Sequence, residues 1–96
     1  MKTSNLNKII IEYCPGCQWL PRSAWMAQEI LNTFENELDE LSLRPAKNEP
    51  GCFRITYEHN TIWCRKKDRG FPQIKELRQR IRDLLAPEKS LGHSDA

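Results

Sequence analysis

The feature that most constrains this chain is a pair of cysteines, in Cys14-Pro15-Gly16-Cys17, between two segments of different periodicity. Before it stands Ile9-Ile10-Ile11, a continuous β-branched run that predicts a buried central strand. Pro15 and Gly16 break that strand. Pro21 suits the first turn of a helix, because it has no N–H to leave unpaired. The chain is therefore expected to turn sharply from strand to helix, with Cys17 beginning the helix and both thiols in the turn.

Residues 20–38 predict an amphipathic helix after this turn. Their apolar side chains recur at spacings of three and four, as one face of a helix requires. The stripe consists of Leu20, Ala24, Ala27, Leu31, Phe34 and Leu38. We expect this face to be buried against a sheet.

Three shorter strands and a second helix complete the expected fold. Residues 41–44, 52–58 and 61–65 alternate between apolar and polar side chains, as strands with one solvent-facing side do. Residues 72–86 begin with proline and carry an apolar stripe, which predicts a helix that Pro87 ends. Because a strand–helix–strand unit makes a right-handed parallel crossover, the expected α/β (α+β) sandwich has a four-stranded mixed sheet. Its order is β-α-β-β-β-α, with both helices on one face.

The last two strands are expected to form a hairpin with His59-Asn60 as a two-residue turn, since Asn tolerates a positive φ. This register places Ile55 opposite Cys64, so that Cys64 packs in the core as a small apolar side chain. It places Trp63 on the open face of the sheet. A Trp63 buried beneath the helices would contradict the register.

Cys14 and Cys17 are the candidate catalytic residues. Their spacing lets the two sulfurs close a tight ring, so either can resolve a mixed disulfide formed by the other. A helix N-terminus favours the thiolate, which is the attacking species, although Glu12 opposes it. We therefore predict thiol–disulfide exchange that needs no metal and no organic cofactor. Trp19 either shapes the surface around the dithiol or packs at the edge of the core.

Four segments make the chain resemble the bacterial relatives of selenoprotein W, in the group that includes selenoproteins T and H. They are Tyr13–Cys17, Pro50–Phe53, Ile62–Lys66 and Gly70–Pro72. The resemblance implies a thioredoxin-like fold and a role in cell redox homeostasis. As partners of the dithiol we expect thiols or disulfides of proteins or of small molecules, such as glutathione. The resemblance also implies that the family's selenocysteine, where present, stands at the position of Cys17. In thioredoxin-like enzymes generally the first cysteine attacks, so the attacking sulfur stays open between Cys14 and Cys17.

The chain departs from the general thioredoxin pattern, which places a cis-proline just before the third strand, facing the C-x-x-C. Neither Pro45 nor Pro50 adjoins Phe53 in that way, so we assign no cis bond here. We expect Gly51 and Cys52 to fill that space. Cys52 is then either a passive buried side chain, the reading we favour, or a third redox-active thiol.

A structural zinc site is one alternative, because four cysteines and two histidines supply enough ligands. Against it, Cys14 and Cys17 form the only close pair, and Cys52 and Cys64 fall out of register on the predicted hairpin. Neither His59 nor His93 is expected to be catalytic, since one lies in a turn and the other in the tail.

A redox-regulated binding module is the other alternative. Residues 65–96 hold nine Lys/Arg against five Asp/Glu, which suits an acidic protein or a nucleic acid as partner. Against nucleic acid, these basic residues are not interleaved with aromatic ones, and no reader motif is present. A solvated loop and an outer helix face explain the charges as well.

Length and hydropathy complete the expectations. The 96 residues predict a single domain, with an ordered core at about 6–86 and a flexible tail at 87–96. No apolar run approaches the ~20 residues of a membrane span, and residues 1–5 lead into no signal-peptide core. We therefore expect a reducing, cytoplasmic location, with no membrane partner. The oligomeric state stays open.

Overall fold

The computed structural model describes residues 6–92 of the chain, and its elements follow the expected order with a short helix added before the last one. In chain order they are β1 Lys8–Tyr13, the 3-10 turn η1 Pro15–Cys17, α1 Leu20–Thr33, β2 Glu40–Pro45, β3 Phe53–Tyr57, β4 Asn60–Cys64, α2 Arg65–Asp68 and α3 Ile74–Leu85.

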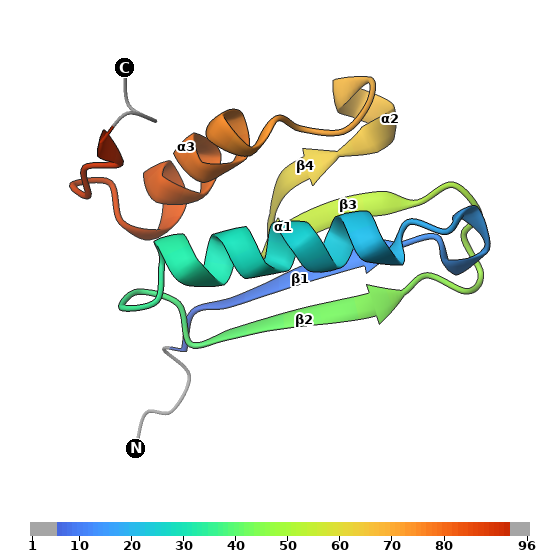
Figure 1. The fold of residues 1–96 in the computed structure, drawn as a ribbon, viewed down its shortest axis with the longest axis horizontal. Helices are drawn as coiled ribbons and strands as arrows, with labels where there is room; N and C mark the ends of the chain where they lie inside the picture. The colour runs from blue at the N-terminus through green and yellow to red at the C-terminus, as the bar shows by residue number, and fades with distance from the viewer. Residues whose placement is uncertain (1–5, 93–96) are drawn as a thin grey trace.

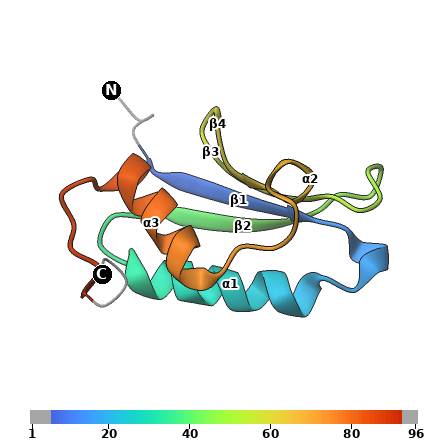
Figure 2. The same ribbon diagram turned by 90° about the horizontal axis from the view of Figure 1, so that it is seen from above.

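The four strands form one mixed sheet in the order β2-β1-β3-β4. β1 pairs in parallel with β2 and antiparallel with β3, which pairs antiparallel with β4. α1 and α3 both lie on one face of this sheet, and neither of these two helices covers the other face (Figures 1 and 2). The predicted thioredoxin-like α+β architecture is confirmed.

The core lies between the sheet and the two long helices. β1 is central and sends Ile9 and Ile11 into it, both fully buried. Ile10 faces the other side of the sheet and is only half-buried. The continuous Ile run therefore marks a central strand, but one that is covered by helices on a single face.

The face of α1 that packs on the sheet differs from the predicted one. The helix buries Ser23, Met26, Ala27 and Ile30. Leu20 and Leu31, both in the predicted stripe, are 46% and 42% exposed. The helix contains a second apolar stripe through Met26 and Ile30, and the path of the chain out of the turn presents that stripe to the sheet.

The helix also ends earlier than predicted. Thr33 is its last residue, and Phe34 is the C-cap. Phe34 and Leu38 are nevertheless buried, from the turn that leads to β2. Phe34 and Leu38 are thus buried in the same core as the helix, although the helix does not continue through them.

The predicted register of the hairpin is wrong. Tyr57 pairs with Asn60, so the turn is Glu58-His59, and Glu58 adopts a left-handed φ of 55°. The register then shifts between Thr56 and Ile55, as in a β-bulge, and Ile55 pairs with Trp63. The turn thus comes one residue earlier than predicted, and β4 contains one extra residue at the bulge. This extra residue moves Trp63 to the core face and Cys64 to the open face.

Trp63 is consequently buried on the core side, at 5% exposure. Its indole Nε1 donates a hydrogen bond of 2.8 Å to the Gly70 carbonyl oxygen, which removes the cost of burying that donor. The Arg80 guanidinium of α3 lies 4.4 Å from the ring centroid. The large aromatic ring is the better occupant of the core position for which we predicted Cys64.

Cys64 instead lies opposite Arg54 and is half-buried, so it faces the side of the sheet away from α1 and α3. The expectation that it packs in the core is wrong.

Residues 87–92, the described part of the predicted tail, make several contacts. The Lys89 ammonium lies 3.4 Å from the Glu37 carboxylate, and the Lys89 carbonyl accepts a hydrogen bond of 3.0 Å from Arg82. Leu91 packs against the core cluster. Flexibility of the tail stays a prediction, and His93 lies outside the described residues. Within 6–92, no helix combines the length and apolar character that crossing a membrane requires.

Candidate functional site

The two cysteines of the C-x-x-C segment occupy a separate turn between β1 and α1. Cys14 follows the last residue of β1 in an extended conformation, and Pro15–Cys17 form a single 3-10 turn. Gln18 then takes a left-handed conformation, with φ 61°, and its N–H donates to the Pro15 carbonyl at 3.2 Å. α1 begins only at Leu20, so the expectation that Cys17 begins the helix is wrong. Because the helix-dipole effect fades beyond the first turn, it stabilises a thiolate less than predicted.

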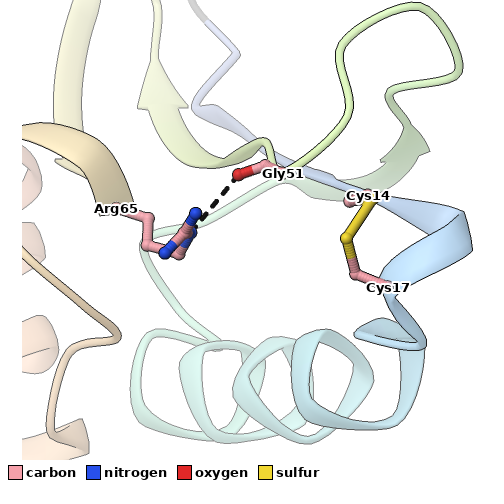
Figure 3. Close-up of a disulfide and its surroundings, with 4 residues drawn as sticks. All are labelled: Cys14, Cys17, Gly51 and Arg65. Atoms are coloured by element: carbon pink, nitrogen blue, oxygen red, sulfur yellow. Dashed lines mark hydrogen bonds between the residues drawn. A yellow bond between two sulfur atoms is a disulfide. The ribbon is translucent and has the colours of Figure 1, made fainter.

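Cys14 and Cys17 are joined by a disulfide, with their Cα atoms 5.4 Å apart (Figure 3). The two residues differ in exposure: Cys14 is 4% exposed, and Cys17 is half-buried. The sequence could not distinguish the two sulfurs, whereas the structure gives Cys17 the better access to solvent. The C-x-x-C segment is thus the only disulfide-bonded cysteine pair among residues 6–92.

Gly51 and Cys52 occupy the approach to β3, as expected. No cis peptide bond occurs within residues 6–92. Gly51 has a φ of 80°, in the left-handed region that favours glycine. Cys52 is 3% exposed, and its N–H donates to the Glu49 carbonyl at 3.1 Å. Burial raises the pKa of the Cys52 thiol, and the nearby Arg54 guanidinium opposes that rise.

An aromatic cluster, whose rings contact two arginine side chains, includes Trp19, which follows the C-x-x-C segment by two residues. The Trp19 and Phe71 rings meet edge to face at 4.9 Å between centroids, and Phe71 also lies 4.9 Å from Phe53. The Arg22 guanidinium lies 4.1 Å from the Phe71 centroid, and that of Arg65 lies 5.0 Å from the Trp19 centroid. Trp19 therefore packs at the edge of the core, which is one of the two roles that the sequence left open.

Arg65 and Phe71 were missed as site residues in the sequence analysis. Arg65 lies just after β4, and its Nε donates to the Gly51 carbonyl at 3.3 Å (Figure 3). The segments that contain them were noticed only as part of the family resemblance. Nothing local in the sequence indicates that α2 and the loop before α3 return to the C-x-x-C turn.

The acidic residue that was expected to oppose thiolate formation is engaged elsewhere. The Glu12 carboxylate accepts a hydrogen bond of 2.9 Å from Arg54 Nε and lies 3.5 Å from Arg44. Arg54 also binds Glu49, and this hydrogen bond lowers the pKa of the Glu49 carboxyl. The negative charge of Glu12 is therefore largely balanced on the open face of the sheet.

The arrangement does not favour a metal centre. Among the described residues, no three His, Cys, Asp or Glu side chains gather in a way that could hold a metal ion. Of the cysteines that made zinc possible on paper, Cys14 and Cys17 bond to each other, which leaves Cys52, just before β3, and Cys64, at the end of β4, as the free thiols among the described residues.

Comparison with known proteins identifies the family. The model of the Rdx family matches residues 8–83. A protein from Bordetella parapertussis with a known crystal structure is 49% identical in sequence to this chain, and the two structures match with a TM-score of 0.79. The match covers 84% of this chain and 100% of that one. A selenoprotein W-related protein from Vibrio cholerae is 45% identical, with a TM-score of 0.77, over 83% and 98% of the two chains. No protein of curated function matches. The predicted resemblance is thereby confirmed, and the chain belongs to the Rdx family.

Proposed function

We propose that this protein is a thiol–disulfide redox protein whose Cys14–Cys17 pair cycles between dithiol and disulfide. The observation that carries the proposal is the Cys14–Cys17 disulfide in the turn that ends the central strand β1. The site requires no metal or organic cofactor, because the two sulfurs supply both the nucleophile and the resolving group. Membership of the Rdx family supports this class of chemistry.

We assign the attacking role to Cys17 and the resolving role to Cys14. Cys17 is half-buried, whereas Cys14 is 4% exposed, so a substrate reaches Cys17 more readily. This choice also agrees with the family resemblance, which places selenocysteine, where present, at the position of Cys17.

In the proposed cycle, the Cys17 thiolate attacks one sulfur of a substrate disulfide, and the other substrate sulfur leaves as a thiolate and takes up a proton. The Cys14 thiolate then attacks Cys17 Sγ, which releases the second substrate sulfur as a thiol. Two electrons have passed from the protein to the substrate, and Cys14–Cys17 is the disulfide formed. Two glutathione thiols, or another cellular dithiol, return it to the reduced state.

The substrates we propose are disulfides of proteins or mixed disulfides with glutathione, with a peroxide as the other oxidant of this class. A reducing compartment such as the cytoplasm would supply the thiols that complete the cycle.

A nucleic-acid partner receives less support from the structure than a thiol partner. The basic residues of α3 are largely engaged within the protein: Arg78 contacts Glu29 of α1, and Arg80 contacts Asp68. Their charges are therefore partly neutralised and unavailable as a phosphate-binding row.

The test is a redox titration in glutathione buffers, with each state trapped by alkylation and measured by mass. We expect a reversible loss of two hydrogen atoms at Cys14 and Cys17. With a glutathionylated substrate, Cys14→Ser should accumulate a mixed disulfide on Cys17, whereas Cys17→Ser should accumulate much less on Cys14. Free thiols at both positions across the whole range would overturn the proposed function. The reverse trapping pattern would overturn the assignment of roles.

A further inference from the structure

Two cysteines have no part in the proposed cycle, and the corrected hairpin register brings them to the same face of the sheet. Cys64 lies directly opposite Arg54, and Cys52 stands two residues before Arg54. Cys52 directly precedes β3, and side chains two residues apart in extended backbone point to the same side, so we place Cys52 and Cys64 diagonally across the hairpin on the open face.

A shared pocket supports this placement independently. Its lining consists of Glu49, Cys52, Phe53, Arg54, Cys64 and Lys66. The pocket has room for about a water molecule, so it does not admit a peptide or glutathione. Cys52 is therefore expected to receive an oxidising equivalent from within the protein more readily than from a peptide or from glutathione.

Cys14 is the group placed to pass an oxidising equivalent to Cys52. In the β1–β3 ladder, Glu12 pairs with Arg54 and Tyr13 with Phe53, so one further step places Cys14 beside Cys52. Cys14 and Cys52 are both buried, at 4% and 3% exposure. The buried cysteine of the C-x-x-C pair thus lies on the side of Cys52, and Cys17 is the more exposed of the two.

We propose that Cys52 and Cys64 form a second dithiol, which the Cys14–Cys17 disulfide oxidises by thiol–disulfide exchange. This inference rests on the proposed redox function of Cys14 and Cys17. In the first step, the Cys52 thiolate attacks Cys14 Sγ, and Cys17 leaves as a thiolate and takes up a proton. In the second, the Cys64 thiolate attacks Cys52 Sγ and releases Cys14 as a thiol. The products are a Cys14/Cys17 dithiol and a Cys52–Cys64 disulfide, with two electrons transferred and no external oxidant consumed.

Local charges fit this sequence of steps. Burial keeps the pKa of the Cys52 thiol raised, and the Glu49 and Glu12 carboxylates add to the rise, whereas the Arg54 guanidinium favours the thiolate that the first step needs. The thiol is therefore a slow partner for external reagents. Its position beside Cys14 compensates, because a neighbouring group reacts as if it were highly concentrated.

Tryptic peptides make the test direct, because the four cysteines fall into three peptides. Cys14 and Cys17 share residues 9–22, Cys52 lies in 48–54, and Cys64 lies in 55–65. After oxidation by glutathione disulfide, acid quenching and blocking of free thiols, we expect peptides 48–54 and 55–65 to appear linked to each other. If only the internal disulfide of 9–22 forms and Cys52 and Cys64 stay free, the inference is overturned while the proposed function stands. If Cys14 and Cys17 also stay free, both fail.

Two variants test the route of oxidation. In Cys17→Ser combined with Cys64→Ser, which removes the thiol that completes the second step, mild oxidation should trap a Cys14–Cys52 disulfide that links peptides 9–22 and 48–54. Cys17→Ser combined with Cys52→Ala is the control that should lack the link. In Cys14→Ser with Cys17→Ser, the Cys52–Cys64 disulfide should form at least about tenfold more slowly than in the wild type. Equal rates would overturn the transfer through Cys14, and near-ultraviolet circular dichroism verifies that each variant is folded.

Discussion

Arg65 Nε donates a hydrogen bond of 3.3 Å to the Gly51 carbonyl, and the same guanidinium lies 5.0 Å from the centre of the Trp19 ring. The Arg65 side chain thus connects Gly51, just before β3, to Trp19, two residues after Cys17. The two segments that flank the C-x-x-C turn are far apart in the sequence, and Arg65 holds them from a third segment, just after β4.

Replacing Arg65 should loosen this connection. We expect Arg65→Gln to lower the free energy of unfolding by about 1–2 kcal/mol, from the lost hydrogen bond and the lost cation–π contact. Hydrogen exchange at the Cys52 amide should become faster, because the adjacent Gly51 is no longer anchored. Arg65→Lys should recover only part of the stability, since an ammonium lacks the planar fork of a guanidinium. Urea unfolding gives the first quantity, with Lys75→Gln at an exposed site as control. A Cys52 amide that exchanges at the wild-type rate would contradict this prediction.

Trp63 supplies a test of the hairpin register itself. Trp63→Phe removes the indole N–H that donates to the Gly70 carbonyl, and it shrinks a ring that is 5% exposed. We expect a loss of about 1–3 kcal/mol in unfolding free energy. Trp25→Phe is the matched control, because Trp25 is 49% exposed and its replacement should change stability by less than about 0.5 kcal/mol. Similar losses in the two variants would support the register with Trp63 on the open face.

Asp68 should make stability depend on pH at the acidic end. Its carboxylate accepts the Cys64 N–H at 2.9 Å and contacts Arg80, and these interactions lower the pKa of Asp68. The stabilisation is therefore complete above the pKa of Asp in the unfolded chain, and it is lost as the pH falls through the lowered folded value.

We expect Asp68→Asn to be about 1 kcal/mol less stable than the wild type near pH 7, with the difference closing in acid. Unfolding in urea at a series of pH values measures this difference. Asp83→Asn, at a side chain that is 70% exposed, should show little difference at any pH. A deficit in Asp68→Asn that persists unchanged in acid would show that the carboxylate charge is not its cause.

Ser23 is a buried side chain whose removal should not harm the protein. It is fully buried in α1, and its hydroxyl has no hydrogen-bond partner among the described residues. Because an unsatisfied buried hydroxyl costs about 1–3 kcal/mol, Ser23→Ala should leave thermal stability unchanged or raise it. Met26→Ala, on the same face, should instead cost about 2–5 kcal/mol. A clear loss of stability in Ser23→Ala would indicate that the hydroxyl has a partner.

The fold could be predicted from the sequence wherever the signals are local. The β-branched run before Cys14, the break at Pro15 and the alternation in the later strands are each read from a few neighbouring residues, and the order of the elements follows from them. The buried face of α1 could not be predicted in this way. Two apolar stripes run along that helix, through Leu31 and through Ile30, and only packing on the sheet selects between them.

The cysteines of the hairpin illustrate the same limit at the candidate site. An offset of one residue in pairing moves a side chain to the opposite face of a sheet, so a register without the bulge places Cys64 in the core and Trp63 on the surface. In the predicted register Cys52 and Cys64 do not line up with each other, which counted against a zinc site that includes both. The bulge at Ile55 and Thr56, which has no plain sequence signal, is what places the two thiols around one pocket.

The reactivity of the thiols in the reduced protein gives the last prediction. Cys17 should be alkylated by iodoacetamide before Cys14, because Cys17 is half-buried and Cys14 only 4% exposed. Cys52 should react more slowly than Cys64 at neutral pH. Burial both shields Cys52 and raises the pKa of its thiol, so less of it is present as the reactive thiolate.

The rate at Cys52 should therefore keep rising with pH beyond the point at which an ordinary cysteine has reached its plateau. Peptide mass spectrometry after short pulses of reagent measures each site separately, since Cys52 and Cys64 fall in different tryptic peptides. In urea the difference in alkylation rate between Cys52 and Cys64 should vanish, because we attribute it to the folded structure. If Cys52 instead reacts as fast as Cys64 at neutral pH in the native protein, it is open to external reagents. Oxidants could then reach Cys52 without passing through Cys14.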